Sequence, residues 1–217
     1  MKVTYYLEVV SSWCYWAEPA WAELKRRYAG RVAFQWKIAH MPPEACPQSR
    51  AQAEWYYRRS GTIMRSPFML TGAWFEPGMG PYQVPSLVAE AAKDFKVTDD
   101  RVRLALAHAA EREGKKVGRW EVAVEIAARA AKLNRAKLLK HAKSAAVKSR
   151  TRASTDEFNA LQVNQRPTFL LENNIGDRAV FSGLAKIEPL AATIDAMLAD
   201  EAAYVSYAAH HGNTPPP

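Results

Sequence analysis

The residues best suited to chemistry lie together at one point of the sequence, Ser11-Ser12-Trp13-Cys14. A serine hydroxyl has too high a pKa to serve as a redox centre, but it can donate one hydrogen bond to a thiolate. A strand-like run ends just before these residues and a helix-like run follows, so Ser11 is expected at a helix N-terminus. Free amides and the helix dipole favour negative charge there. The pattern therefore predicts a place where negative charge is stabilised, as it is for the thiolates of cysteines at such positions.

The chain's two cysteines, Cys14 and Cys46, are too few for a disulfide framework. Cys14 lies one helical turn after Ser11, where it is either a small buried hydrophobe or a single redox-active thiol. Cys46 falls in a proline-rich stretch and has no predictable partner. The sequence contains no Gly-x-Ser-x-Gly elbow, and no histidine has zinc-type spacing to a cysteine or carboxylate. A hydrolase triad and a metal site are therefore not predicted.

Hydrophobic periodicity predicts the elements that position these residues. Ser11 or Ser12 is expected as the N-cap of the first helix, because serine is favoured there. A strand–helix–strand opening implies two parallel neighbouring strands joined by a right-handed connection. In chain order the sequence predicts a strand over 3–10, a helix over 13–28, a strand over 32–38, helices between 86 and 161, strands over 168–171 and 178–181, and a helix over 186–198.

The order of the elements predicts the fold class. Without the middle helices it is βαβ followed by ββα, the order of the α/β thioredoxin fold, so those helices form an all-helical insertion. The section before them carries seven prolines among many aromatics, which is typical of an irregular, packed pocket wall. The predicted division is a thioredoxin-fold domain of residues 1–40 and 160–203, an irregular cleft section of 41–85, a helical insertion of 86–159 and a mobile tail of 204–217.

Residues 8–16 and 163–183, together with the helical insertion, resemble the cytoplasmic branch of the DsbA-like thioredoxin-fold superfamily. That branch contains two-cysteine oxidoreductases, kappa-class glutathione transferases and 2-hydroxychromene-2-carboxylate isomerases. Ser11 stands where the redox members have their nucleophilic cysteine, and Cys14 where they have the resolving one. In the transferases and isomerases a serine at the first position contacts the sulfur of glutathione. The resemblance implies glutathione as cofactor, Ser11 as the donor that orients its thiol, and a homodimer.

The resemblance also implies residues around the bound thiol. Arg166 and Pro167 match the family's cis-proline loop, so Pro167 is expected to shape the thiol site and the backbone of Arg166 to pair with the thiol. Relatives usually have an apolar or small residue in place of Arg166, and its charge would lie either beside a carboxylate or thiolate or in solvent. Ser182 is followed by glycine where kappa-type enzymes place a carboxylate, and Ser12 replaces the family's proline.

Large aromatic residues give two alternatives for the cleft. They would either line an apolar pocket for an aromatic or hydrophobic substrate, or pack as part of a tryptophan-rich core. These residues are Trp13, Tyr15, Trp55, Tyr56 and Trp74.

Charge and composition narrow the class of partner. The 217 residues carry a net charge of +8, and residues 112–152 hold 13 lysines and arginines against three acids. This excess is either a solvated helix surface or an attraction for an anionic ligand. It lacks the interleaved aromatics of a single-strand binder, so no nucleic-acid partner is predicted. Neither a membrane-length apolar run nor a signal-peptide pattern is present, and a cytoplasmic location is predicted.

Three hypotheses follow for the function. The preferred one is a glutathione-dependent isomerase or transferase acting on a small hydrophobic or aromatic substrate. The second is a DsbA-family thiol-disulfide oxidoreductase working through Cys14. The third is a non-catalytic binding protein on a decayed redox scaffold.

Overall fold

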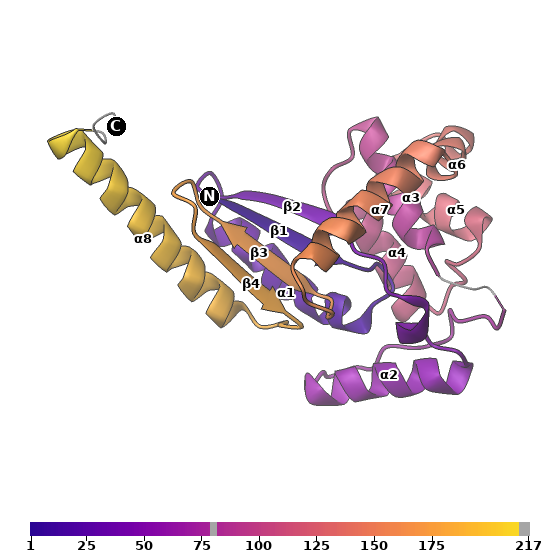
Figure 1. Ribbon diagram of the computed structural model, residues 1–217. Helices are drawn as coiled ribbons and strands as arrows, with labels where there is room; N and C mark the ends of the chain where they lie inside the picture. Colours follow the sequence, from indigo (N-terminus) through magenta and orange to yellow (C-terminus); the bar gives the residue numbers. More distant parts are fainter. Residues whose placement is uncertain (79–81, 213–217) are drawn as a thin grey trace.

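The computed structural model describes residues 1–78 and 82–212 and arranges them around a four-stranded sheet (Figure 1). The sheet has the order β2-β1-β3-β4, in which β1 is parallel to β2 and antiparallel to β3, and β3 is antiparallel to β4. Helix α1 connects the two parallel strands. These elements are β1 (Lys2–Leu7), α1 (Ser12–Arg27), β2 (Ala33–Ile38), β3 (Thr168–Glu172) and β4 (Arg178–Ser182). The thioredoxin-fold prediction is confirmed.

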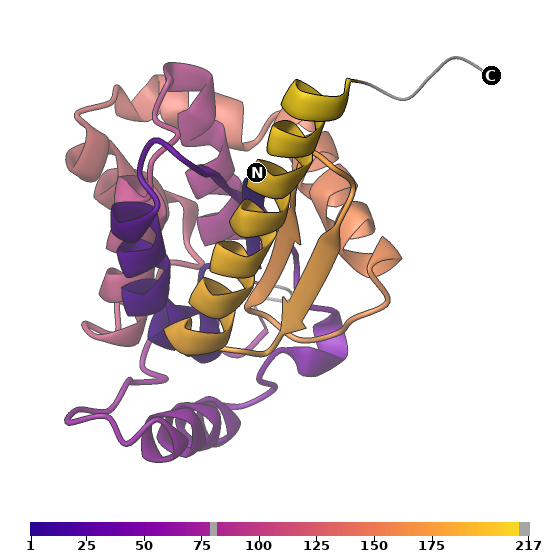
Figure 2. The same ribbon diagram turned by 90° about the vertical axis from the view of Figure 1, so that its left-hand side faces the viewer.

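The two faces of the sheet are covered by different helices. Helices α1 and α8 (Ile187–His211) cover one face (Figure 2). On that face Tyr5 of β1 stacks against Phe169 at 4.8 Å and lies 5.1 Å from Trp21, measured between ring centroids. On the other face Tyr6 packs against Phe158 of α7. Burial of such large side chains contributes about 1.5–3 kcal/mol each. Side chains of β1 alternate between the two faces, so every second residue packs under α1. This packing positions the corner that joins β1 to α1.

Six α-helices lie between β2 and β3 in sequence, and the five that follow α2 (Arg50–Ile63) form a group beside the sheet (Figure 1). Arg103 of α4 is buried and pairs with Glu18 of α1 and with Asp100. Lys25 of α1 also pairs with Asp100. This network of buried charges holds the insertion against α1, the helix that carries Ser11 at its start. The five helices are α3 (Val84–Ala92), α4 (Arg101–Glu111), α5 (Trp120–Ala131), α6 (Arg135–Ala142) and α7 (Ala145–Ala160).

Two segments are more regular than the sequence suggested. The section 41–85 contains helix α2 (Arg50–Ile63), which fits in the proline-free interval between Pro47 and Pro67 and is capped by Ser49. The proline count of the whole section concealed that interval. The closing helix α8 passes the expected end at 198 and reaches His211, because no glycine or proline follows residue 198 before Gly212. Residues 204–211 are thus helical, and 213–217 lie outside the described residues.

Candidate functional site

The corner between β1 and α1 presents Ser11 as the N-cap of the helix, which confirms that expectation. Its Oγ accepts a hydrogen bond from the amide of Cys14 at 3.5 Å, and its own amide donates to the carbonyl of Glu8 at 3.2 Å. Among the described residues, no acceptor takes the amides of Ser12 and Trp13. Since Oγ uses a lone pair on the amide of Cys14, its hydroxyl hydrogen can point to the Cys14 sulfur or turn to a ligand in the cavity. The corner offers three donors at the positive end of a helix dipole.

A buried carboxylate holds this corner to the end of β2. Glu8 accepts hydrogen bonds from the amides of Val9 at 3.1 Å and Met41 at 3.3 Å, and from the hydroxyl of Ser86. Its other contact is the Nδ1 atom of His40 at 3.1 Å. Sequence reasoning treated Glu8 only as part of a strand face. An acid within an otherwise apolar strand end was the signal that a polar network lies beneath it.

Cys14 faces the interior instead of the cleft. Its side chain is 3% exposed, and burial raises the pKa of its thiol to about 12, although hydrogen bonds from the Ser11 hydroxyl and the Glu8 backbone to the sulfur act in the lowering direction. At pH 7 roughly one thiol in 10⁵ would be ionised. Cys46 is also buried, forms no disulfide, and has a pKa raised by burial. Both thiols have the environment of inert structural cysteines.

The Arg166–Pro167 peptide bond is cis, and Arg166 has an unforeseen environment. Its guanidinium donates to the carbonyls of Ala39 at 2.8 Å and His40 at 2.6 Å, and lies 4.1 Å from the ring centroid of Phe158. The solvent alternative is wrong, since the side chain is 8% exposed, and Arg166 also lines the cavity described below. It secures the loop before β3 to the end of β2, while burial lowers its pKa.

A cavity of about 320 Å³ opens over the corner. Its walls come from the N-terminus of α1, the loop 41–47, helix α2, Trp74 and the loop 164–166. This volume lies at the lower end of the range for small-molecule sites. The cavity brings together six residues that the sequence singled out: Ser11, Ser12, Trp13, Tyr56, Trp74 and Arg166.

Other predicted residues lie outside this lining. Tyr15 packs edge-on against Trp16, and Trp55 is 55% exposed on α2. Ser182 accepts a hydrogen bond from the hydroxyl of Thr168 at 3.2 Å, and Pro167 accepts one from the amide of Gly183. Pro167 therefore shapes the loop, whereas its neighbour Arg166 reaches the cavity wall.

Arg59 is a site residue that sequence reasoning missed. It lines the cavity from α2, and its guanidinium lies 4.7 Å from the ring centroid of Trp55 and 5.5 Å from that of Tyr56. Among the described residues it makes no ion pair with an acid. The charged lining residues are Arg59 and Arg166, and no carboxylate shares the wall with them. The cavity is therefore suited to an anion. The spacing of Arg59 three and four residues after two aromatics was the available signal.

The sequence from residue 2 to residue 195 matches the family described as DSBA-like thioredoxin domain. The chain belongs to this family. No curated protein sequence gives a significant match to it.

Solved structures similar to this DSBA-like thioredoxin domain include a disulfide reductase and an isomerase. The cytosolic disulfide reductase DsbM from Pseudomonas aeruginosa is 18% identical with a TM-score of 0.71, over 91% of this chain and 98% of that one. A structure of DsbM with GSH gives 17% identity and a TM-score of 0.70, over 91% and 99%. A 2-hydroxychromene-2-carboxylate isomerase is 13% identical with a TM-score of 0.62, over 94% and 99%. At these identities the likeness concerns the fold.

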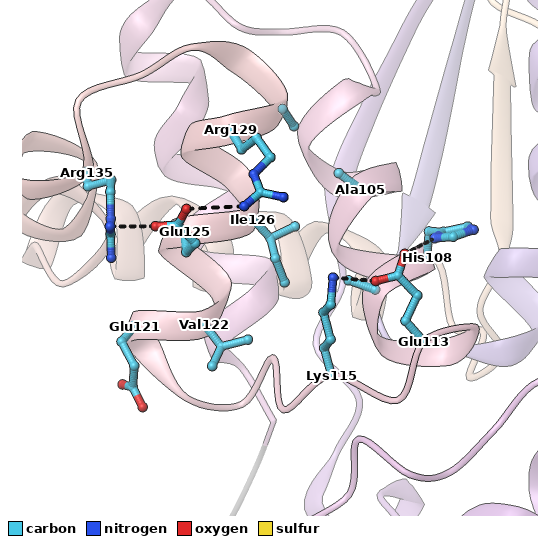
Figure 3. Close-up of a pocket in the computed structure, with 12 residues that line it drawn as sticks. Ala105, His108, Glu113, Lys115, Glu121, Val122, Glu125, Ile126, Arg129 and Arg135 are labelled. Atoms are coloured by element: carbon cyan, nitrogen blue, oxygen red, sulfur yellow. Dashed lines mark ion pairs between the residues drawn. The ribbon is translucent and has the colours of Figure 1, made fainter.

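A second, larger hollow of this DSBA-like domain lies between α4 and α5 (Figure 3). Ion pairs occupy its rims: Glu113 pairs with Lys115 and His108, and Glu125 with Arg129 and Arg135. These charges satisfy one another, and the hollow shares no lining residue with the cavity over Ser11. In the part of the chain that the structure describes, no group of side chains could hold a metal ion, and no helix combines the length and apolar character of a bilayer span.

Proposed function

We propose that this DSBA-like thioredoxin domain is a glutathione-dependent isomerase or transferase that acts on a small hydrophobic or aromatic substrate. The observation that carries the proposal is the α1 corner, where the hydroxyl group of Ser11 and the amides of Ser12 and Trp13 open on a cavity with cationic walls. These groups would bind the sulfur of an external thiol as its thiolate. The chain itself has no nucleophile at that position.

The chemistry assigned to these residues is limited to binding and activation. The S–H proton of the bound thiol would pass to solvent, and the donors at the α1 corner would hold the resulting thiolate at neutral pH. The thiolate would then form a C–S bond to one carbon of an electrophilic double bond while the π electrons move to the far end of the conjugated system. In a transferase that end would take a proton from solvent, and in an isomerase the thiolate would be expelled again after bond rotation. Trp13, Tyr56 and Trp74 would supply apolar contact for the substrate. Arg59 would attract a carboxylate of the thiol ligand or the substrate.

The GSH-containing structure of DsbM supports the choice of thiol, because that reductase has a similar fold. The proposal includes a cytoplasmic location, in agreement with the similar fold of DsbM, a cytosolic disulfide reductase. A homodimer remains a prediction. The oxidoreductase hypothesis draws no support from Cys14, because burial keeps its thiol protonated. Turnover of a substrate would distinguish the proposed enzyme from a non-catalytic binding protein.

The test is calorimetric titration with reduced glutathione of the wild type, Ser11→Ala and Ser144→Ala. Both substitutions remove a serine N-cap, since Ser144 caps α7 by accepting from the amide of Val147 at 3.3 Å. Each should lower stability by about 1 kcal/mol. Only Ser11→Ala should weaken glutathione binding, by about 1.5–3 kcal/mol, because a hydrogen bond to a charged group is lost. Equal affinity of the two variants, or no binding to the wild type, would refute the proposal.

A further inference from the structure

Glu111, the last residue of α4, is fully buried, and among the described residues neither of its carboxyl oxygens has a hydrogen-bond partner. The buried acids Glu8 and Asp100 are different, because hydrogen bonds and cations compensate them. An unpaired carboxylate would be strongly disfavoured in such a place, and the group neutralises instead. Burial accordingly raises the pKa of Glu111 well above its usual value. The fold therefore keeps a protonated carboxylic acid, with one O–H to donate, in its interior.

Three ionisable side chains from neighbouring elements face this acid. Tyr57 comes from α2, and its hydroxyl lies beside the carboxyl group without a hydrogen bond of normal geometry. Glu18 and Tyr15 come from α1, and Glu18 is already paired with Arg103. Of the three, only Tyr57 also lines the cavity over Ser11. Tyr57 is thus the ionisable side chain that links the carboxyl group of Glu111 to a ligand in that cavity.

The hydroxyl of Tyr57 is already part of the cavity wall. It donates to the carbonyl of Val10 at 3.3 Å, and its oxygen accepts a hydrogen bond from Nε1 of Trp74. Val10 lines the cavity and directly precedes Ser11. A donor that is held this near to Ser11 can turn from a long, weak bond with a neutral carbonyl to a stronger one with an anion.

The end of α4 also fixes the loop that carries Trp74. The amide of Thr71 donates to the carbonyl of Glu111 at 2.8 Å. Gly114 follows with a φ of +67°, and a Cβ atom at that position would lie 2.6 Å from the Cβ of Ala73. The loop can approach α4 this closely only because residue 114 is glycine. The contact between this loop and the end of α4 therefore holds both the Trp74–Tyr57 hydrogen bond and the Glu111 carboxyl group in place.

We propose that neutral Glu111 donates a hydrogen bond to the Tyr57 oxygen and thereby makes Tyr57 a second hydroxyl donor, beside Ser11, for an anionic ligand in the cavity. An oxygen that accepts bonds from Trp74 and from Glu111 is a stronger donor through its own hydrogen, since chained hydrogen bonds polarise one another. Glu111 touches no ligand and is a positioning residue. The inference rests on the proposed function for the identity of the ligand, a thiolate, but the protonation of Glu111 and its coupling to Tyr57 are independent of it.

The experiment compares Tyr57→Phe, Glu111→Gln and Glu111→Met with wild type by calorimetry with reduced glutathione. Tyr57→Phe should weaken binding roughly 10- to 150-fold, the range for one hydrogen bond to a charged group. Glu111→Met should weaken it in the same direction, and the double variant no further than the more affected single one. Glu111→Gln keeps a neutral donor and should bind within about twofold of wild type. At alkaline pH, ionisation of Glu111 should weaken glutathione binding to wild type, and Glu111→Gln should remove this loss of affinity.

Two measurements without ligand separate this inference from the proposed function. The infrared difference spectrum of wild type against Glu111→Gln should show the carbonyl band of a protonated carboxylic acid at neutral pH. Denaturant unfolding of Tyr57→Phe, Glu111→Met and the double variant should be non-additive. A carboxylate band, or additive unfolding free energies, overturns the inference. If Ser11→Ala weakens glutathione binding and Tyr57→Phe does not, the inference fails while the proposed function stands. If wild type binds no glutathione, the proposed function and the ligand role of Tyr57 fail together, whereas the band and the coupling still decide the state of Glu111.

Discussion

Replacing Ser11 by cysteine in a Cys14→Ala background would measure the electrostatics of the α1 corner directly. The new sulfur would take the place of Oγ, beside the free amides of Ser12 and Trp13. A helix N-terminus favours an anion by about 0.3–2 kcal/mol, and each hydrogen bond to it adds about 1.5–3 kcal/mol before desolvation is subtracted. Ser11 is 8% exposed, so desolvation offsets much of this gain. A net gain of about 1.4–2.7 kcal/mol, about one to two units, would lower the pKa from ~8.5 to about 6.5–7.5.

The assay is thiolate absorbance in the ultraviolet against pH, with the alkylation rate as a second readout. Cys46 does not interfere because burial raises its pKa. Ser144→Cys, at the N-cap of α7, is the matched control, since it shares the helix terminus but not the cavity, and its pKa should fall less. The lowered pKa of the thiol introduced by Ser11→Cys would stabilise the folded state above pH ~8.5, and this gain would be lost as the pH falls through the folded-state pKa. A pKa at or above ~8.5 for that thiol would refute the argument for a thiolate site.

Three further predictions follow from the contacts. The raised pKa of Cys14, about 12, gives stability that is present below pH ~8.5 and is lost as the pH rises toward 12. In that interval the unfolding free energy of wild type, measured with denaturant, should fall by about 1.4 kcal/mol per pH unit more than that of Cys14→Ala. Parallel pH curves for the two proteins would contradict this prediction. Arg59→Ala should weaken binding of glutathione about tenfold while Arg58→Ala, on the same helix but outside the cavity lining, leaves it unchanged, and equal effects would refute the role of Arg59. Arg103→Ala should cost about 3–5 kcal/mol of unfolding free energy, because it leaves the largely buried Glu18 without its cation and Asp100 with Lys25 as its remaining partner cation. Exposed Arg101→Ala should cost no more than about 1 kcal/mol, and a small loss for both would refute the network.

The fold was predictable because its signals are local. Alternation in β1, helical spacing in α1 and the Asn/Gly turn between β3 and β4 each follow from a short window of sequence. Ser11 was recognisable for the same reason, since a serine between a strand and a helix is a preferred N-cap. Element ends were less certain. The apolar periodicity of α8 stops at 198 where its packing on the sheet stops, but alanine-rich sequence continues the helix to His211.

The chemistry of the cavity was only partly predictable because it depends on long-range contacts. Arg166 looked like a free cation in the sequence, but the carbonyls of Ala39 and His40, more than 100 residues earlier, determine its direction. Arg59 lies on α2, a helix that was not predicted because the section 41–85 is rich in proline. Glu111 is an ordinary helical acid in the sequence, and only tertiary packing shows that it has no partner among the described residues. Burial and pairing of charges are properties of the assembled fold, so no local window contains them.

Positions 11 and 14 lie one helical turn apart, and their environments act on a sulfur in opposite directions. At position 14 burial dominates, and the pKa of the thiol rises to about 12. At position 11 the helix N-terminus and an open, cationic cavity favour an anion, but the chain supplies a hydroxyl there. A disulfide between these two positions cannot form, since only one of them carries sulfur. Thiol-disulfide exchange within the corner would therefore need a second sulfur from a ligand, whereas activation of a ligand thiolate needs only the donors already in place. This asymmetry is the physical reason for proposing isomerase or transferase chemistry with a borrowed thiol.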